Sequence, residues 1–526
     1  MGVYKSAELE ELSVLSKKCL NLGGRRITLA RLKNGYAAID NLCPHRGGHL
    51  CDGTIKEDSE EIVCPLHGWN FDLKTGVSPY NTSDSVKVFR VEEREDGIYV
   101  EIPDENELPP LTDYLDPWRR RSDDIETGME MIHHMADGWI GKHGYTEPMR
   151  TENQDPLWDS ILFLPRQLAG LPKLDDDTVN LKTVIGKSAK KPITIDLPVY
   201  VSHMSFGALS REAKIALAIG AKKAGTMICS GEGGMLPEER KEAGIYILEM
   251  ASGYFGWTKE ARDLADGFEI KIGQAAKAGM GGMLPGKKVT TEIAKVRGIE
   301  EGKDAFSPSH FPDINSVADL RKRVDEIRKE SGGKPVGIKI AAGRIEDDLR
   351  SALECAPDFI TIDGRGGATG AAPKHVKDNI CVPTLYALSR AKAFLDKEGA
   401  NVDLLITGGF RLPSDIAKAI AMGATAVAVA SAAMMAIGCQ QYRACHTGNC
   451  PVGIATQNEE LRKRLDVGIS SGKLFNYFTA TRHQLEDFTR ICGGESVHDL
   501  SVSDLATTNS EIARYTKIRH VGELIG

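Results

Sequence analysis

The stretch that decides the fold is VGIKIAAGRIEDDLRSALECAPDFITIDG, residues 336–364. It places two short runs rich in β-branched residues, VGIKIAAG and FITIDG, on either side of a helical segment. Apolar runs of this kind suit parallel strands that are buried on both faces. The stretch therefore predicts a strand-helix-strand unit.

The same alternation continues through the chain from about residue 195. The runs are PVYVSHM, TMICSG, FEIKIG, DAFSP, VGIKIAAG, FITIDG, DLLITGG and TAVAVAS. Eight strand-helix units predict an α/β fold, a (β/α)8 TIM-type barrel over residues 196–526. Functional groups of such barrels lie where the strands end. Here those positions are Ser205, Glu232, Gln274, Lys339, Gly366, Gly367, Gly408 and Gly409.

The chain ahead of the barrel has a different pattern. From about residue 10 to 103, short alternating apolar runs separated by turn residues predict a small all-β domain, which we assign to residues 1–104. Residues 105–195 begin with a stretch rich in proline and acids, typical of a linker, and we expect a helical connector after it. The sequence thus predicts a multidomain protein.

Composition narrows the function classes. The 526 residues are 41% hydrophobic and 27% charged, with a net charge of −8. We find no apolar stretch of the roughly 20 residues that a membrane span requires, and no secretory signal. The acidic balance argues against nucleic acid. We therefore expect a cytoplasmic protein with neither membrane nor nucleic acid as partner, and a homo-oligomer, as barrel enzymes often are.

Two mixed pairs of cysteine and histidine lie in the N-terminal region. They are Cys43 with His45 and, after eighteen residues, Cys64 with His67. Thiolates on one iron and imidazoles on the other are the Rieske arrangement. A zinc finger would instead keep its two cysteines together and its two histidines together. The region resembles the Rieske ferredoxins, and we expect Cys51, nearby, to be a packed thiol.

Three further cysteines crowd into residues 439–450, directly after the last predicted strand. Cys439, Cys445 and Cys450 have a spacing that suits three irons of a cubane cluster. We predict a [3Fe–4S] cluster here, with [4Fe–4S] as the alternative.

The surrounding motifs resemble the glutamate synthase family, and in particular its shorter archaeal type. The resemblance rests on SHMSFGALS, SGEGGMLPEER, EIKIGQAAKAGMGGMLPG, GGATGAAP and GCQQYRACHTGNCPVGIATQ, and covers roughly residues 150–490. It implies an FMN-binding barrel. The family's glutaminase domain needs a cysteine exposed after Met removal, whereas residue 2 is glycine. We therefore expect that this chain does not itself release ammonia from glutamine by that route, and that a separate glutaminase subunit is a candidate partner.

The resemblance also implies roles for individual residues. Substrate contacts to 2-oxoglutarate or 2-iminoglutarate fall to Glu232, Gln274, Lys277 and Arg297, although a solvated helix face would explain Arg297 equally well. Barrels of this type bind phosphate after strands seven and eight. The expected FMN-binding residues are Ser205, Gly207, Lys271, Lys339, Gly366, Gly367, Gly408, Gly409 and Ser431. One departure is Met283, where glutamate synthases carry a polar residue.

The leading hypothesis is therefore an FMN- and iron–sulfur-dependent oxidoreductase that reductively aminates 2-oxoglutarate or a related acid, with electrons relayed by both clusters. No nucleotide-binding fingerprint follows a strand, so we expect a ferredoxin or a separate reductase as electron partner. Met283 motivates an alternative, a dehydrogenase of an amine, N-methylated amino acid or hydroxy acid. A Rieske oxygenase with its iron in GMEMIHHMADGWIGKHG and a non-catalytic redox sensor are further alternatives.

Overall fold

The computed structural model describes residues 2–44, 49–65, 69–79, 85–102, 128–136, 158–367, 369, 372, 379–441, 445 and 448–523. The chain divides into two compact units. The first comprises Met1–Pro117 with Glu147–Met149, and the second comprises Trp118–Thr146 with Arg150–Gly526. Each unit folds around hydrophobic cores of its own.

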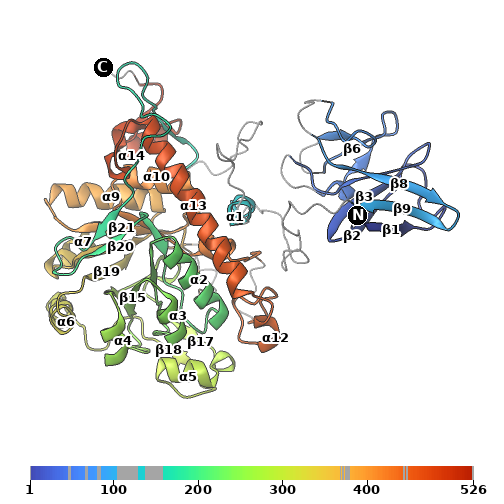
Figure 1. The fold of residues 1–526 in the computed structure, drawn as a ribbon. Helices are drawn as coiled ribbons and strands as arrows, with labels where there is room; N and C mark the ends of the chain where they lie inside the picture. The colour runs from blue at the N-terminus through green and yellow to red at the C-terminus, as the bar shows by residue number, and fades with distance from the viewer. Residues whose placement is uncertain are drawn as a thin grey trace. The chain divides into compact units, whose positions relative to one another are not determined.

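The first unit is all β, as predicted (Figure 1). Its six-stranded sheet has the order β1 (Gly2–Ala7), β9 (Gly97–Ile102), β8 (Val88–Arg94), β4 (Tyr36–Asp40), β3 (Arg25–Arg31) and β2 (Lys17–Leu22). A smaller sheet contains β5 (Thr54–Ile55), β6 (Glu61–Val63) and β7 (Asn70–Asp72). β1 lies ahead of residue 10, where the alternating pattern becomes recognisable in the sequence. Its own stretch, GVYKSA, is short and only partly buried, so the sequence does not mark it as a strand.

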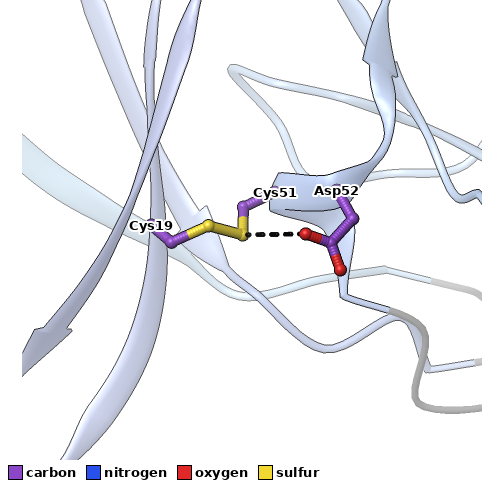
Figure 2. A group of neighbouring side chains, drawn as sticks. All are labelled: Cys19, Cys51 and Asp52. Carbon is purple, nitrogen blue, oxygen red and sulfur yellow. Dashed lines mark hydrogen bonds between the residues drawn. A yellow bond between two sulfur atoms is a disulfide. The ribbon is translucent and has the colours of Figure 1, made fainter.

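The expectation of a packed thiol at Cys51 is wrong. Cys51 forms a disulfide with Cys19 of β2, with the two Cα atoms 5.7 Å apart (Figure 2). The bond joins β2 to the 3-10 helix η1 (Leu50–Asp52). The partner lies 32 residues before Cys51, on a strand outside the two Cys–His motifs, so local spacing in the sequence does not predict this pairing.

The second unit is a closed barrel of eight parallel strands, which confirms the predicted fold. In order around the barrel the strands are β13 (Val199–Val201), β14 (Met227–Cys229), β15 (Ile245–Met250), β16 (Gly267–Lys271), β19 (Val336–Ala341), β20 (Phe359–Asp363), β21 (Asp403–Thr407) and β22 (Ala426–Val429). β22 pairs back onto β13, with Tyr200 opposite Ala428.

One predicted barrel strand is wrong. DAFSP contains β18 (Ala305–Phe306), which pairs antiparallel with β17 (Met283–Leu284) outside the barrel. The missing barrel strand is β15, IYILEM, which follows the short helix α3 (Pro237–Glu242). With only six residues in that helix, the strand-helix spacing is too short to stand out in the sequence.

The expected helical connector is helical only at α1 (Met129–Ala136) among its described residues. Residues 158–195 instead contain β10 (Ile161–Phe163) and the hairpin β11 (Thr183–Ile185) with β12 (Ile193–Ile195). Hairpin side chains share a core with the barrel interior. Backbone amides of its turn donate to Asp403, at the start of β21, so the hairpin covers the N-terminal end of the barrel.

Helices surround the barrel (Figure 1). They are α2 (Arg211–Lys223), α4 (Lys259–Leu264), α5 (Thr291–Arg297), α6 (Val317–Glu330), α7 (Ile345–Glu354), α9 (Thr384–Lys397), α10 (Pro413–Ala421), α11 (Ser431–Ala436), α12 (Glu459–Arg462), α13 (Val467–Ile491) and α14 (Ser510–Tyr515). The long α13 packs along α2 and also contacts α1. β23 (Leu505–Thr507) and β24 (Arg519–His520) extend β10 into a small sheet. Within the described part of the chain, no helix combines the length and apolar character needed to cross a bilayer.

We expect loss of the disulfide to loosen η1. Closing a loop of this length stabilises a fold by about 2–4 kcal/mol, mainly by restricting the unfolded chain. In the oxidised full-length protein, replacing both Cys19 and Cys51 by serine should speed hydrogen–deuterium exchange of the peptides that cover β2 and η1. Cys355→Ser, a buried free thiol in the other unit, is the control. Unchanged exchange in the double variant would refute a stabilising role.

Candidate functional site

The cysteines of the predicted Rieske site are buried in the first unit. Cys43 and Cys64 belong to one hydrophobic core, against which Trp69 also packs. Two contacts close the loops that follow these cysteines: a bridge between Leu42 and His49, and a hydrogen bond from the Cys64 amide to the Trp69 carbonyl. His45 and His67, the predicted imidazole ligands, lie outside the described residues. The two thiols thus lie in one core, each at the start of a loop that its own backbone contact closes. A cluster that takes ligands from two loops requires this arrangement.

The disulfide itself is not a metal site. The Cys19 and Cys51 sulfurs and an Asp52 carboxylate oxygen lie within 4.8 Å of one another (Figure 2). Asp52 Oδ1 is 4.0 Å from the Cys51 sulfur, but a disulfide sulfur carries no hydrogen to donate and no thiolate charge for a cation.

Most of the predicted barrel residues meet at the C-terminal strand ends. Ser205 and Gly207 follow β13, Glu232 follows β14, and Lys271 ends β16. Gln274 precedes the 3-10 helix η3 (Ala275–Lys277), which ends with Lys277. Gly366 and Gly367 follow β20, Gly408 and Gly409 follow β21, and Ser431 begins α11 after β22. The hairpin β11–β12 covers the other end, so chemistry is confined to this one.

Glu232 is the centre of a buried polar group. Lys271 Nζ lies 2.9 Å from Glu232 Oε2, and the Ser307 hydroxyl donates to Glu232 Oε1. Burial alone would raise the pKa of Glu232, but Lys271 and Ser307 together lower it to about 2. A Cβ added at Gly282 would lie 2.7 Å from Glu232 Oε1 and 2.6 Å from Ser307 Oγ, so a larger residue there would force these side chains to shift. Glu232 is therefore a fixed carboxylate anion at neutral pH.

A second set of buried charges continues around the barrel from Lys271. Glu249 lies 3.6 Å from Lys271 and 3.7 Å from His203, and His203 Nε2 lies 2.7 Å from Glu269 Oε2. The short distance between these two atoms brings the imidazole ring directly against the Glu269 carboxylate. Burial would raise the pKa of Glu269, yet the His203 ring lowers it. His203 Nδ1 is also 3.4 Å from Lys339 Nζ.

Lys339 thus has neighbours, as its burial requires. Its ion pair with Asp363 is long, at 3.9 Å, and burial raises the pKa of Asp363 against the effect of Lys339. Sequence reasoning singled out Lys339 but missed His203, Glu249, Glu269 and Asp363. Glu249 escaped notice because its strand was missed. A charged residue inside a barrel strand, such as Glu269, is unusual, and this feature of the sequence could have identified Glu269 and Asp363.

Lys277 and Arg297 differ from these groups, because neither forms an ion pair with any described residue. The Lys277 ammonium donates to the Gly281 carbonyl, and Arg297 donates to the Phe206 carbonyl and lies over the Phe255 ring. Each is only 6% exposed. Burial lowers the pKa of Lys277 and lowers that of Arg297 to about 10. Arg297 is thus not on a solvated helix face, and its Nε has no hydrogen-bond partner.

A buried lysine fixes the two loops that carry Ser205 and Glu232. Lys214 of α2 donates to the carbonyl of Met204 at 2.6 Å and to that of Ser230 at 2.9 Å. Its charge is balanced by Glu239 at 2.8 Å, whose other oxygen accepts from Tyr246. The pair is fully buried, so the loops after β13 and β14 are held by strong contacts with no competition from water.

Glycines bring the loops after β20 and β21 together. A Cβ on Gly366 would lie 2.4 Å from the Gly408 carbonyl, and one on Gly408 would lie 2.6 Å from that of Gly364. Gly408 and Gly409 have φ of 122° and 90°, which favour glycine. Backbone amides exposed in such side-chain-free loops are the groups that bind phosphate. The loops therefore fit the phosphate end of FMN.

The three barrel cysteines follow α11 on a single loop. Two side chains from distant segments hold its backbone: His133 of α1 lies 3.0 Å from the Cys439 carbonyl, and Lys288 donates to the Cys445 carbonyl at 2.9 Å. Burial raises the pKa of the Cys445 thiol, and Cys450 raises it further, which places those two sulfurs within electrostatic reach. Three thiols on a braced loop fit a cubane cluster.

His133 was also a candidate ligand for an oxygenase iron. Its contact with the Cys439 carbonyl assigns it to the cysteine loop instead. The side chains of Glu130 and His134, together with Asp137 and His143, lie outside the described residues, as does that of Met283.

A cavity of about 260 Å³ lies between α9, α10 and the C-terminal segment. Lys392, Asp396, Met422 and Lys517 are among its lining residues. None of the predicted site residues lines it, so it is separate from the barrel site.

Comparison with known proteins identifies two regions. Residues 165–495 match the family described as "Conserved region in glutamate synthase", and residues 2–90 match "Rieske [2Fe-2S] domain". The Archaeal-type glutamate synthase [NADPH] of Thermotoga sp. (strain RQ2) is 38% identical over 328 residues, which cover 62% of this chain and 63% of that protein.

Two further relatives are similar. The Archaeal glutamate synthase [NADPH] of Archaeoglobus fulgidus (strain ATCC 49558 / DSM 4304 / JCM 9628 / NBRC 100126 / VC-16) is 40% identical over 369 residues, covering 65% of this chain and 72% of that protein. The Glutamate synthase large subunit-like protein of Rhizobium meliloti (strain 1021) is 33% identical over 396 residues, covering 71% and 89%. The chain therefore spans less than two thirds of the Thermotoga protein but most of the Rhizobium one.

The low pKa of Glu232 predicts a pH-dependent contribution to stability. Its folded value of about 2 lies below the ordinary 4.5, so the contribution is present above about pH 4.5 and is lost as pH falls from 4.5 toward 2. At 1.36 kcal/mol per pKa unit, it amounts to about 3 kcal/mol. Urea unfolding should show wild type more stable than Glu232→Gln at pH 7, with the difference closing in acid.

The matched control is Glu300→Gln, at an exposed glutamate. It should leave the acid dependence unchanged. A difference between wild type and Glu232→Gln that stays constant from pH 7 to 3 would contradict the assigned ion pair.

Proposed function

Since this chain belongs to the glutamate synthase family and carries a Rieske domain, we propose that it reductively aminates 2-oxoglutarate or a closely related oxo acid. The reaction joins the oxo acid with one ammonium, two electrons and two protons, and releases glutamate and one water. The observation that carries the proposal is the pair of buried cations, Lys277 and Arg297, without ion-pair partners among the described residues.

Charge balance favours a dianionic substrate. An unpaired buried cation is costly, and a bound carboxylate offsets that cost. 2-Oxoglutarate has a carboxylate for each of the two cations, and Arg297 can donate to it through its unpartnered Nε. Gln274, half-buried beside Lys277, supplies an amide to orient the oxo or imino group.

The neighbouring groups hold charge and do not exchange protons readily. Glu232, with a pKa of about 2, is a poor proton donor at neutral pH, so we assign it no proton-relay role. Its function is to keep Lys271 charged: burial opposes the charge, but Glu249 and Glu232 raise the pKa of Lys271. Lys271 and Lys339 occupy paired positions on adjacent strands, each with a carboxylate partner.

The proposed cofactor sites follow from the same residues. Gly366, Gly367, Gly408, Gly409 and Ser431 would hold the FMN phosphate, with Ser205, Gly207, Lys271 and Lys339 toward its ring. A Rieske [2Fe–2S] cluster would take Cys43, His45, Cys64 and His67, and a [3Fe–4S] or [4Fe–4S] cluster Cys439, Cys445 and Cys450. When bound, FMN supplies hydride transfer and the clusters supply single electrons.

We further propose the domain division 1–104, 105–195 and 196–526, with a ferredoxin or separate reductase as electron donor and a separate glutaminase subunit or free ammonia as nitrogen source. The linkage of both cluster sites in one chain supports the electron route. Residues 103–127 join the end of β9 to α1, and α1 contacts the cysteine loop. Covalent linkage of two sites in one chain makes their encounter intramolecular, which can raise the effective concentration to about the millimolar range.

The deciding experiment is anaerobic. The holoenzyme is reduced, 2-oxoglutarate and ammonium are added, and flavin reoxidation is followed together with glutamate formation. Reoxidation with stoichiometric glutamate supports the proposal. No reaction, from protein shown to contain flavin and both clusters, rejects it; flavin reduction by an amine, N-methylated amino acid or hydroxy acid would then assign the reverse chemistry.

Replacing Lys277 by methionine tests the substrate pocket. Because the change removes a buried cation and keeps the side-chain length, we expect KM for the oxo acid to rise at least tenfold, about 1.4 kcal/mol or more. Lys287→Met, ten residues along at an exposed position, should leave KM unchanged. An unaltered KM in Lys277→Met would mean that the cation does not bind substrate.

A further inference from the structure

A side-chain amide lies against the first cysteine of the barrel loop. Gln441 Nε2 donates to Cys439 Sγ at 3.3 Å. Gln441 is buried, and its φ of 52° is in the left-handed region that few non-glycine residues adopt. Backbone strain of this kind persists where the surrounding structure enforces it, and it gathers at functional sites.

The contact has chemical meaning for one form of cysteine. A neutral thiol is a weak acceptor, whereas a thiolate accepts a charge-assisted hydrogen bond. A buried amide that donates to sulfur is therefore matched to a cysteine that is deprotonated, as a cluster ligand is.

We propose that Gln441 is a positioning residue that sets the reduction potential of the barrel cluster through its hydrogen bond to the Cys439 thiolate. The inference rests on the assignment of that cluster under the proposed function. Hydrogen bonds to ligand sulfurs are among the factors that tune cluster potentials. Because reduction adds negative charge, a donor stabilises the reduced state more and raises the potential.

The loop around Gln441 is built to hold this donor in place. Gln440, 1% exposed, donates its own side-chain amide to the Gly438 carbonyl. His133 lies at the Cys439 carbonyl, so the backbone on both sides of the thiol is fixed. Lys288, at the Cys445 carbonyl, fixes the next turn of the loop. These contacts fix the backbone from which the Gln441 amide reaches the Cys439 sulfur.

The two neighbouring glutamines provide a matched test. Gln441→Met keeps side-chain length and removes the donor to sulfur, and Gln440→Met makes the same change at a residue that bonds a carbonyl. In the full-length holoenzyme, redox titration followed by electron paramagnetic resonance measures the midpoint potential of each cluster. We expect Gln441→Met to shift the reduction equilibrium of the barrel cluster about tenfold toward the oxidised state, equal to 59 mV for one electron.

The same titration contains its controls. Gln440→Met should change the midpoint potential of the barrel cluster by only a small fraction of that shift. Neither variant should change the midpoint potential of the Rieske cluster. A barrel potential that is equal in wild type and Gln441→Met, or a shift of the same size in Gln440→Met, overturns the inference. A wild-type protein with no barrel cluster overturns it together with the cluster assignment.

A second measurement uses only the wild-type protein, so that the inference can be tested even if a variant fails to assemble the cluster. Wild-type holoenzyme labelled with nitrogen-15 in the glutamine side chain is examined by pulsed electron paramagnetic resonance in a paramagnetic state of the barrel cluster. A glutamine-amide coupling supports the inference and its absence overturns it. Glutamate formation plays no part in either readout, so failure of the proposed substrate leaves this result standing.

Discussion

Closure of the barrel by β13 and β22 is the contact on which the site depends. Val199, Tyr200 and Val201 pair in register with Val427, Ala428 and Val429, more than 220 residues later. Because every strand then points the same way, all the loops that follow strands gather at one end. The pairing of β13 with β22 brings the first and last loops of the barrel together. The charged side chains, the glycine loops and the cysteine loop therefore share one end of the barrel.

The strand ends carry several buried charged side chains, which a hydrophobic core does not need for its packing. Lys271 and Lys339 occupy paired positions on adjacent strands, where like charges repel. Glu232, Glu249, Glu269 and Asp363 surround them, and His203 links two of these carboxylates. Lys214 and Glu239 add a neutral, fully buried pair behind the loops. Such an arrangement is costly to desolvate, so packing and stability alone do not account for it.

The fold was largely predictable from local pattern, and the site only in part. Seven barrel strands show as β-branched runs, but β15 was missed because α3 before it is short, and DAFSP was taken in its place. Lys271, Lys277 and Glu232 lie in motifs that a sequence presents directly. The roles of His203, Glu249 and Glu269 arise from contacts across different strands, and neither composition nor spacing records such contacts. Cys19 and Cys51 show the same limit, since their disulfide depends on the pairing of β2 within the sheet.

Under the proposed function, two buried cations account for how the predicted pocket can lack one polar side chain and still favour an acidic substrate. The resemblance that implies the substrate contacts has one departure, Met283, where glutamate synthases carry a polar residue. Ion pairs to a carboxylate are worth more than a single neutral hydrogen bond, roughly twice as much. Lys277 and Arg297 are both buried and both lack an ion-pair partner among the residues that the structure describes. Under the proposed function, they would supply this stronger interaction to the substrate. The proposed preference for an acidic substrate therefore rests on these two cations and not on a polar side chain at position 283.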